Sequence, residues 1–263
     1  MPISSKTQII VSSLYLFPNL SFQEAYTFGL FMEIGTIFAA VVYFRKELIE
    51  IVQALLGSKN DAHRKLLVYV VAVTVITGIV GAPLYLITDS IKKGIAVGIP
   101  MLILGLVLIA DAAFIRYSRK RLEKGISSRK LENFTIKDYL LIGIAQGIAA
   151  LPGVSRSGIT TSAMLLMNVE PDDAFRLSFF AGIFAAIGAF GITLVTTRSN
   201  VAAAVAGIGL VGLAVAIVVS TVVSLFLIDF LVKIAGKSKI IYLTSALGII
   251  AIASGLLYLA IGL

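Results

Sequence analysis

The chain has few of the residues on which many soluble enzymes depend. It contains no cysteine, no tryptophan and a single histidine, His63. The absence of cysteine excludes disulfide bonds, a thiolate nucleophile and cysteine-ligated zinc. A Ser-His-Asp triad would have to use His63, and its charged surroundings in SKNDAHRK argue against that role.

Charged residues are also scarce, at 14% of the chain against about 25% in an average soluble domain. Hydrophobic residues make up 59% of the 263 residues, and the mean hydropathy is +1.02. A soluble domain of this length cannot bury so much apolar surface. The apolar runs are continuous rather than alternating, which favours membrane helices over an outer-membrane barrel. We therefore predict an all-α, polytopic membrane helical bundle that forms one membrane domain over residues 1–263.

Six apolar segments are long enough to cross a hydrocarbon core of about 30 Å, and 201–232 is long enough to tilt or extend beyond it. Three further apolar segments, 9–20, 138–151 and 158–168, are too short to span and are typical of re-entrant or buried helices. Two of them flank PGVSRSG, which predicts a re-entrant pair of helical segments that turns at Pro152-Gly153. The six predicted spans are 22–44, 66–88, 95–115, 171–196, 201–232 and 239–262.

The net charge of +8 follows the predicted topology. Sixteen of the 22 Lys and Arg residues lie in segments 45–65, 116–137 and 233–239, whereas loops 89–94 and 197–200 hold three. Alternating the six spans puts the three basic segments on one face, which the positive-inside rule makes cytoplasmic. The charge therefore indicates a multi-pass protein of the plasma membrane in contact with membrane lipids, and it does not indicate a nucleic-acid partner.

The chain resembles itself at a spacing of about 150 residues. Residues 2–6, PISSK, align with 152–156, PGVSR, and Glu24-Ala25-Tyr26 resembles Asp173-Ala174-Phe175. The spans that follow run in opposite directions, which predicts inverted-topology repeats with a site near the bilayer midplane. We expect a first repeat over 1–115, a basic cytoplasmic loop over 116–137 and a second repeat over 138–263.

The segment 151–158, LPGVSRSG, is the strongest local signal. Arg156 lies between two apolar stretches, and a cation at the centre of a span costs about 2.5–3.5 kcal/mol on insertion scales. Backbone N–H groups at the start of the next helix, hydroxyls and a guanidinium together describe a phosphate site. The alternative is a helix break from which Arg156 snorkels to the surface. The residues assigned to this anion site are Ser155, Arg156, Gly153, Ser157, Gly158, Thr160 and Thr161.

Other polar residues in apolar surroundings complete the candidate site. Ser4, Ser5 and Lys6 are predicted to form its second half, and Gln146 is placed to hydrogen-bond a site oxygen. Glu33 lies inside the first span, where it has three alternative roles: metal ligand, base, or partner of Arg156 or Lys6. Asp111 and Asp229 lie near the ends of their spans and are interpreted as residues at the membrane interface.

The sequence resembles the undecaprenyl-diphosphate phosphatase family of integral membrane enzymes. The resemblance covers nearly the whole chain and rests on PISS at 2–5, GTIFAAVVYFR at 35–45 and GIAQGIAALPGVSRSGIT at 143–160. It implies hydrolysis of a polyprenyl diphosphate to the monophosphate with a divalent cation, Mg²⁺ or Ca²⁺. It also implies an inverted-repeat fold with an active site open to the outer face. The family's catalytic Ser-Arg pair falls on Ser155 and Arg156, and its PISS serine falls on Ser5.

The chain departs from the family pattern at two places. The family's Glu-x-x-x-Glu helix precedes PISS, whereas this chain begins at the motif, so we expect either an upstream start or a different source of the acids. Gln8 stands where bacterial members often carry a His, and Glu33 stands where the family usually has Gln. We hypothesise that Glu33 takes over part of the missing acidic role, in catalysis and as a metal ligand.

Two functions remain open at this point. The first is a phosphatase whose nucleophile is Ser155 or a metal-activated water. The second is a transporter or flippase of a lipid phosphate or another anion, which would use the same repeats and the same anion site. The sequence also leaves room for a homodimer.

Overall fold

The computed structural model describes residues 22–91, 98–124, 128–151, 154–196, 198–235, 237 and 239–260. Throughout these residues the secondary structure is helical, apart from short connections and a single bridge between Arg129 and Val169. The all-α prediction is therefore confirmed. In chain order the α-helices are α2 (Phe22–Tyr43), α3 (Arg45–Leu55), α4 (Asp61–Ile91), α5 (Gly98–Glu123), α6 (Ile136–Ile148), α7 (Arg156–Leu166), α8 (Pro171–Thr196), α9 (Arg198–Ala235) and α10 (Lys239–Ala260).

Five of the described helices are long and apolar enough to cross a membrane. They confirm a polytopic membrane bundle and coincide with five of the six predicted spans. The remaining predicted span, 22–44, coincides with the 22-residue helix α2, of whose described residues Phe31–Tyr43 form an apolar segment, so a total of six spans stays a prediction. The membrane-length segments are Asp61–Ile87, Met101–Arg121, Pro171–Ile192, Gly209–Ile234 and Lys239–Leu257.

The longest helix, α9, is interrupted at Gly209. This residue has φ 79° and ψ 153°, a backbone conformation that glycine adopts without the strain that a side chain would impose. Among the described residues, the part of the helix from Gly209 to Ile234 is long and apolar enough to cross a membrane. The predicted span over 201–232 therefore corresponds to α9, with a kink at Gly209 that was not predicted, because the sequence pattern does not distinguish a glycine inside a helix from a glycine that breaks one.

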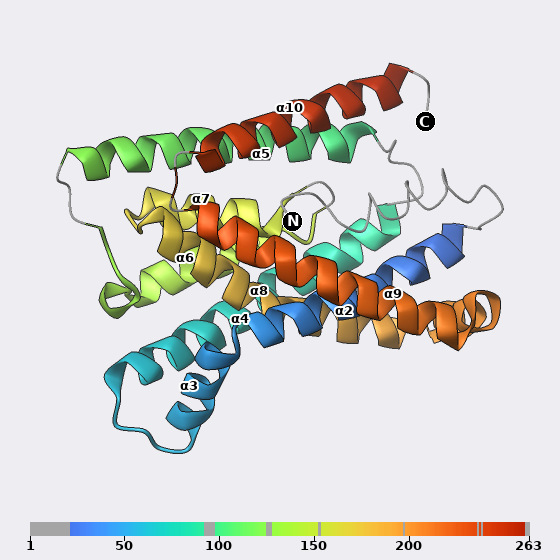
Figure 1. Cartoon of the computed structure of the whole chain (residues 1–263), viewed down its shortest axis with the longest axis horizontal. Coiled ribbons are helices and arrows are strands. Elements are labelled where there is room, and N and C mark those ends of the chain that lie inside the picture. The colour runs from blue at the N-terminus through green and yellow to red at the C-terminus, as the bar shows by residue number, and fades with distance from the viewer. Residues whose placement is uncertain are drawn as a thin grey trace.

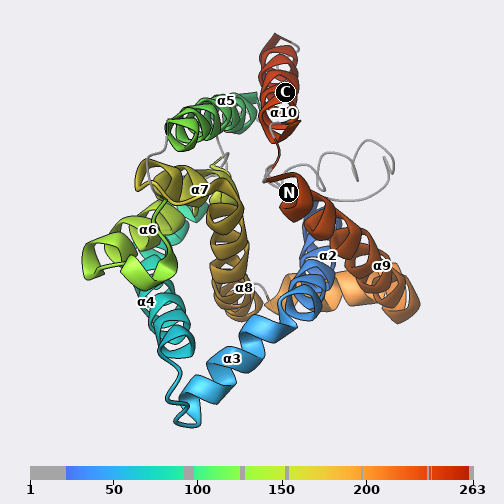
Figure 2. The ribbon, with the colours of Figure 1, turned by 60° about the vertical axis from the view of Figure 1, so that its left-hand side comes forward.

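Two pairs of helices pack closely, α2 with α9 and α5 with α10 (Figures 1 and 2). In the first pair, a Cβ atom added to Gly35 would lie 2.5 Å from the carbonyl oxygen of Ile217. In the second pair, a Cβ added to Gly105 would lie 2.7 Å from the carbonyl oxygen of Gly248. Small residues at these crossings let the backbones approach, which is the usual packing mode of membrane helices. Each pair joins a helix from the first half of the chain to one from the second.

The two short helices α6 and α7 contact one another, and α7 also packs on α5 and α8 (Figure 1). They contain 13 and 11 residues, and the turn between them includes the described residues 149–151 and 154–155. The predicted break of the apolar segment into two short helices is therefore confirmed. Packing of α6 against α4 fixes its position, because Gly143 faces Ile76 and Gly147 faces Val80 at distances that leave no room for a Cβ.

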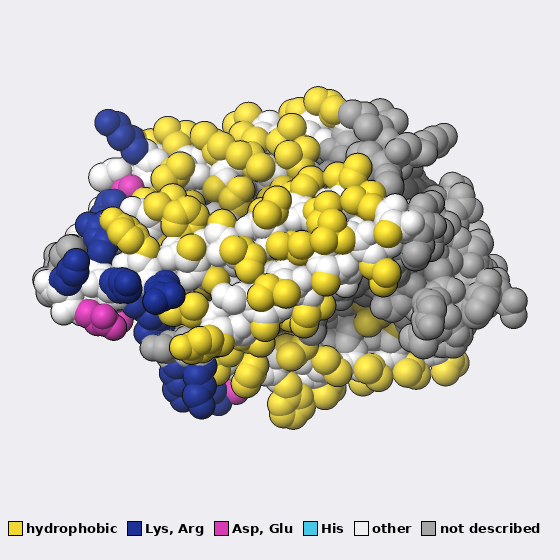
Figure 3. All heavy atoms as spheres, turned by 90° about the horizontal axis from the view of Figure 1, so that it is seen from above, with side chains coloured by type: hydrophobic (Ala, Val, Ile, Leu, Met, Phe, Trp, Pro, Cys, Tyr) yellow, Lys and Arg dark blue, Asp and Glu magenta, His cyan; other side chains and the backbone are white. Residues whose placement is uncertain are grey.

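Lys and Arg side chains gather at one end of the molecule, which we call the basic end (Figure 3). At this end the Arg129 guanidinium donates to both carboxylate oxygens of Asp138, at 3.1 and 2.7 Å, and its backbone N–H donates to the carbonyl of Asn168. Asp138 also closes a capping box with Thr135 at the start of α6. Arg129 thus ties the beginning of α6 to the connection that follows α7. The resulting ion pair and hydrogen bonds hold the pKa of Asp138 at about 2.

An aromatic cluster supports the same end of α6. The rings of Tyr69, Phe134 and Tyr139 pack with centroids 6.2–6.3 Å apart, and the buried Tyr69 hydroxyl donates to the carbonyl of Leu177 in α8. The cluster joins α4, α6 and α8 through buried rings and one satisfied hydroxyl. Together with the Arg129 contacts, the aromatic cluster fixes the distance between the basic end and the turn that joins α6 to α7.

Candidate functional site

The site is built on the N-terminus of α7. Ser155 is the N-cap, and its hydroxyl accepts a hydrogen bond from the backbone N–H of Gly158 at 3.2 Å. A serine side chain commonly satisfies one of the free N–H groups of the first helical turn in this way. The remaining N–H groups and the helix dipole favour an anion at this position. Ser155 is 4% exposed, so such an anion would meet it in a largely dehydrated environment.

Arg156 extends from the first position of α7 toward α8. Its guanidinium lies over Gly182, where an added Cβ would be 3.6–3.8 Å from three guanidinium atoms. Glu33 of α2 is the carboxylate that acts on it electrostatically. The structure thus brings together Arg156 and Glu33, two ionisable residues predicted for the site. The glycine on α8 was not predicted, because its contact with Arg156 depends on helix packing.

A group of hydroxyls surrounds the same turn. Ser157 lies 3.5 Å from Ser155, oxygen to oxygen, and Ser178 of α8 donates to the backbone carbonyl of Ser157 at 3.3 Å. Thr160 is fully buried, and its hydroxyl bonds to the carbonyl of Arg156 at 2.7 Å and to the hydroxyl of Ser178. Thr160 and Ser178 therefore attach α7 to α8. Ser155 and Ser157 carry the hydroxyls closest to the helix N-terminus.

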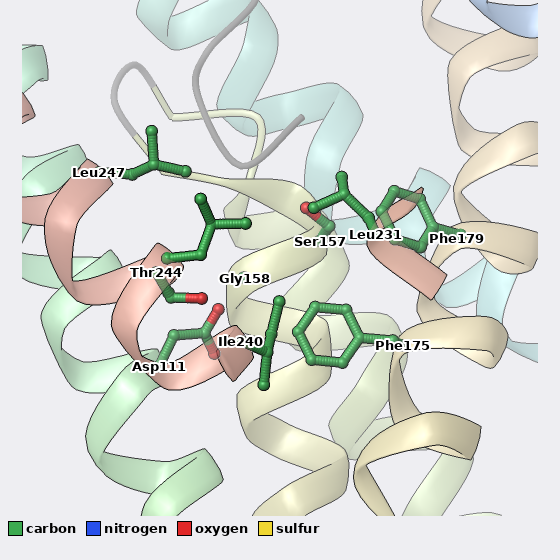
Figure 4. A pocket seen from close by; sticks show the side chains of 10 residues that line it. Asp111, Ser157, Gly158, Phe175, Phe179, Leu231, Ile240, Thr244 and Leu247 are labelled. Carbon is green, nitrogen blue, oxygen red and sulfur yellow. The ribbon is translucent and has the colours of Figure 1, made fainter. Parts of the chain in front are cut away.

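Asp111 of α5 lies behind this turn, and its interpretation as a residue at the membrane interface stays a prediction. It is 2% exposed, and its Oδ1 atom accepts a hydrogen bond from Ser162 of α7. A Cβ added to Gly158 would lie 3.0 Å from its Oδ2 atom. Asp111 also lines a cavity of about 20 Å³ with Ser157, Gly158 and, in Figure 4, Thr244 of α10. The sequence feature that could have pointed to Asp111 as a site residue is an acidic side chain within an apolar run.

Gln146 is buried at the interface of α6 and α4. Its amide nitrogen donates to the hydroxyl of Thr77 at 3.2 Å, and Thr77 in turn donates to the carbonyl of Gly143. Its amide oxygen has no hydrogen-bond partner among the described residues. The contact that the structure gives Gln146 is therefore with α4, and its predicted bond to a substrate oxygen stays a prediction. Four further predicted site residues, Ser4, Ser5, Lys6 and Gly153, lie outside the described residues.

The expected divalent cation was tested against the carboxylates near Arg156. Within the described residues, no group of three or more His, Cys, Asp or Glu side chains could hold a metal ion. Mg²⁺ bound with a phosphate substrate commonly uses one or two carboxylates, and phosphate and water oxygens complete its shell. Glu33 supplies one carboxylate beside Arg156. The described donor set therefore fits an ion shared with a phosphate rather than a site enclosed by protein.

Comparison with known proteins identifies the family. The family described as bacitracin resistance protein BacA matches residues 1–253. A protein of Saccharolobus solfataricus named undecaprenyl-diphosphatase is 47% identical over 98% of this chain and 90% of its own length. Proteins of the same name from Sulfurisphaera tokodaii and Pyrobaculum aerophilum are 44% and 38% identical, over 99% and 98% of this chain and 93% and 92% of their own lengths. The chain therefore belongs to the BacA family.

Proposed function

We propose that the protein is a membrane-embedded phosphatase that hydrolyses undecaprenyl diphosphate, or another polyprenyl diphosphate, to the monophosphate and inorganic phosphate. The reaction regenerates a lipid carrier of cell-wall and glycan synthesis. The observation that carries the proposal is the start of α7, where the Ser155 cap, free N–H groups and Arg156 form an anion site inside a membrane bundle. The name undecaprenyl-diphosphatase on relatives that match nearly the whole chain supports the same substrate.

The chemistry is transfer of the terminal phosphoryl group to water. Arg156 and the N–H groups of α7 bind and neutralise the diphosphate, and such electrostatic stabilisation is most of the catalytic task in phosphoryl transfer. Ser155 is placed to act as a nucleophile or to orient an attacking water. Glu33 would hold a Mg²⁺- or Ca²⁺-type ion together with the phosphate oxygens, and the bound ion would add positive charge to the site. Ser5, Ser4 and Lys6 are assigned to the same site from the sequence.

The proposed site lies deep in the plasma membrane and opens to its outer side. At 1.5 Å per residue, the 13 residues of α6 reach about 20 Å from the basic end into a core of about 30 Å. The positive-inside rule assigns the basic end to the cytoplasm, so the turn before α7 is closer to the opposite face. The prenyl tail would lie between the spans. The pairing of α2 with α9 and of α5 with α10 across the two halves supports the inverted repeat.

The test is release of inorganic phosphate from undecaprenyl diphosphate by the purified protein in detergent. We expect release by the wild type, a loss of about 100-fold or more in Arg156→Ala, and partial recovery in Arg156→Lys, which restores charge without the planar fork. Arg116→Ala, which removes an exposed cation at the basic end, is the matched control and should behave as wild type. Movement of intact lipid phosphate across vesicles without phosphate release would instead support the transporter and overturn the proposal.

A further inference from the structure

The buried carboxylate of Asp111 has no ionic partner in the described part of the protein. Its Oδ1 accepts from Ser162, and among the described residues no charged side chain of α7, α8 or α10 faces it. Burying an acid in this way costs free energy that hydrogen bonding to one hydroxyl does not fully offset. An ionisable group kept at such a position within a membrane bundle is a candidate for function.

A small cavity connects Asp111 with the turn that carries the phosphate site. Its polar wall is formed by Asp111, Ser157 and Thr244, and the rest of the lining is mainly apolar. In Figure 4 the Thr244 hydroxyl and the Asp111 carboxylate point toward one another, and Ser157 stands beyond Gly158 on the other side. A volume of about 20 Å³ holds one water molecule, and the three polar side chains supply the partners that a buried water needs.

The hydroxyls at the start of α7 are arranged so that they can pass a proton toward this cavity. Ser155 Oγ accepts the N–H of Gly158, so its own proton is free to be donated to Ser157 Oγ, 3.5 Å away. When Ser155 is the donor, the Ser157 proton is free for an acceptor in the cavity. In this arrangement a proton can pass from Ser155 through Ser157 and a cavity water to Asp111, from the phosphate site to a buried carboxylate.

We propose that Asp111 is the proton acceptor of the phosphatase site, reached through Ser157 and one water in the cavity. The proposal rests on the proposed function. As the nucleophile oxygen of Ser155 or of water bonds to the terminal phosphorus, its O–H bond breaks and the proton passes to the carboxylate. The bridging P–O bond breaks, and its electron pair leaves with the prenyl monophosphate. When Ser155 has attacked, water then cleaves the phosphoserine and returns one proton to the serine oxygen. Asp111 gives its proton to the inorganic phosphate that departs.

This assignment supplies a base to a site that otherwise offers few. Among the described residues around the start of α7, Glu33 is engaged electrostatically by Arg156, and the other polar side chains near the turn are hydroxyls. A hydroxyl can relay a proton, but at neutral pH it does not hold an additional proton as a base would. Asp111 is thus the described carboxylate that is placed behind the nucleophile rather than against the phosphate-binding cation.

The first test compares Asp111→Asn with wild type for phosphate release from undecaprenyl diphosphate. Asparagine keeps the size and can still accept from Ser162, but it cannot take a proton. We expect kcat to fall by about 100-fold or more, as is typical when a general base is lost, with KM and the detergent melting temperature little changed. Asp111→Glu should recover part of kcat. Asp229→Asn, which removes an exposed acid paired with Lys233, is the matched control and should keep wild-type activity.

A double variant separates a proton relay from a merely structural role. If Ser157 and Asp111 act in one relay, Ser157→Ala combined with Asp111→Asn should be no slower than the slower single variant. Multiplied losses, or wild-type kcat in Asp111→Asn, would overturn the relay. If Asp111→Asn does not fold, Thr244→Val keeps the cavity shape and should lower kcat several-fold at constant KM; unchanged kcat would reject the water route. A wild type that releases no phosphate rejects the proposed function, whereas an active wild type with an equally active Asp111→Asn rejects the relay alone.

Discussion

At the scale of single residues, Gly182 decides whether the Arg156 guanidinium can lie against α8. A Cβ at this position would be in ordinary van der Waals contact with the guanidinium, at 3.6 Å from Nε, so alanine fits. A leucine side chain would extend into the volume that the guanidinium occupies. We expect Gly182→Ala to keep kcat/KM within a few-fold of wild type and Gly182→Leu to lower it by about 100-fold, because misplacing a catalytic group by about 1 Å has that effect.

The measurement is kcat/KM for phosphate release, with the detergent melting temperature as a control for folding. Gly188→Leu is the matched substitution on the same helix, because nothing lies within 4 Å of a Cβ at that position. It should keep both activity and stability. Equal activity in Gly182→Leu and Gly188→Leu would show that the position of the guanidinium over α8 does not matter to the reaction.

We propose that Glu33 carries part of the acidic role that the family motif places elsewhere. It lies on α2 within electrostatic range of Arg156. If its charge serves the reaction, Glu33→Gln should abolish turnover while expression and melting temperature stay near wild type. The dependence of the melting temperature on added Mg²⁺ or Ca²⁺ gives a second readout, since a bound ion stabilises the folded state. Wild-type turnover and an unchanged ion response in Glu33→Gln would remove this hypothesis.

The part of the candidate site that could be predicted from the sequence consists of residues that are neighbours in the chain. Ser155, Arg156, Ser157 and Gly158 occupy four consecutive positions at one helix start, so their composition and a predicted helix break were enough to assemble them. The contacts of Asp111 with Gly158 and Ser162 were not predictable, because they join segments about 50 residues apart. Its depth depends on how α5 packs on α7, and the hydropathy pattern of α5 does not contain that information.

At the scale of helices, α6 is held at the basic end by one ion pair and its cap. The Arg129 guanidinium, followed by the backbone and side chain of Thr135, lowers the pKa of Asp138 to about 2 from an ordinary value of about 3.9. A carboxyl group whose folded-state pKa is depressed stabilises the fold above its unfolded pKa and loses that contribution as the pH falls. The window for this loss runs from about pH 4 to about pH 2.

The expected consequence is a stability difference that depends on pH. Asp138→Asn should be less stable than wild type by about 2–3 kcal/mol at pH 7, since one pKa unit corresponds to about 1.4 kcal/mol, and the difference should largely vanish near pH 2. Thermal unfolding in detergent, followed by circular dichroism, measures it. Asp229→Asn is the control, because its exposed pair with Lys233 contributes little. A difference that is the same at pH 7 and pH 2 would mean that Asp138 acts by packing alone.

The short helices were predictable because the length of an apolar segment indicates whether it can cross a bilayer. Segments near 138–151 and 158–168 are too short to cross a bilayer and appear as α6 and α7, separated at the predicted turn. The kink in α9 was not predictable, because the chain contains 23 glycines and most of those in apolar runs look alike. Gly209 breaks the helix, whereas Gly35 and Gly105 sit within helices where another backbone approaches. Which role a glycine takes is decided by its neighbours in space.

At the scale of the whole molecule, the distribution of charge sets the expected orientation. The segments rich in Lys and Arg are far apart in the chain, yet their side chains gather at one end of the bundle (Figure 3). The rest of the bundle surface carries apolar side chains, such as Val211, Phe226 and Leu257, that are more than half exposed and suit a lipid environment. The basic end is therefore expected to face the cytoplasm, so that the turn before α7 lies closer to the outer leaflet.

The absence of cysteine makes this orientation directly measurable. Single variants Lys130→Cys, at an exposed position of the basic end, and Lys93→Cys, in the predicted outward loop, are treated in intact cells with a maleimide that does not cross membranes. We expect Lys93→Cys to be labelled at once and Lys130→Cys to be labelled after permeabilisation, while the wild type stays unlabelled. The reversed pattern would place the basic end outside. The turn between α6 and α7 would then be closer to the cytoplasmic leaflet, and the phosphatase would have to take its substrate from that side.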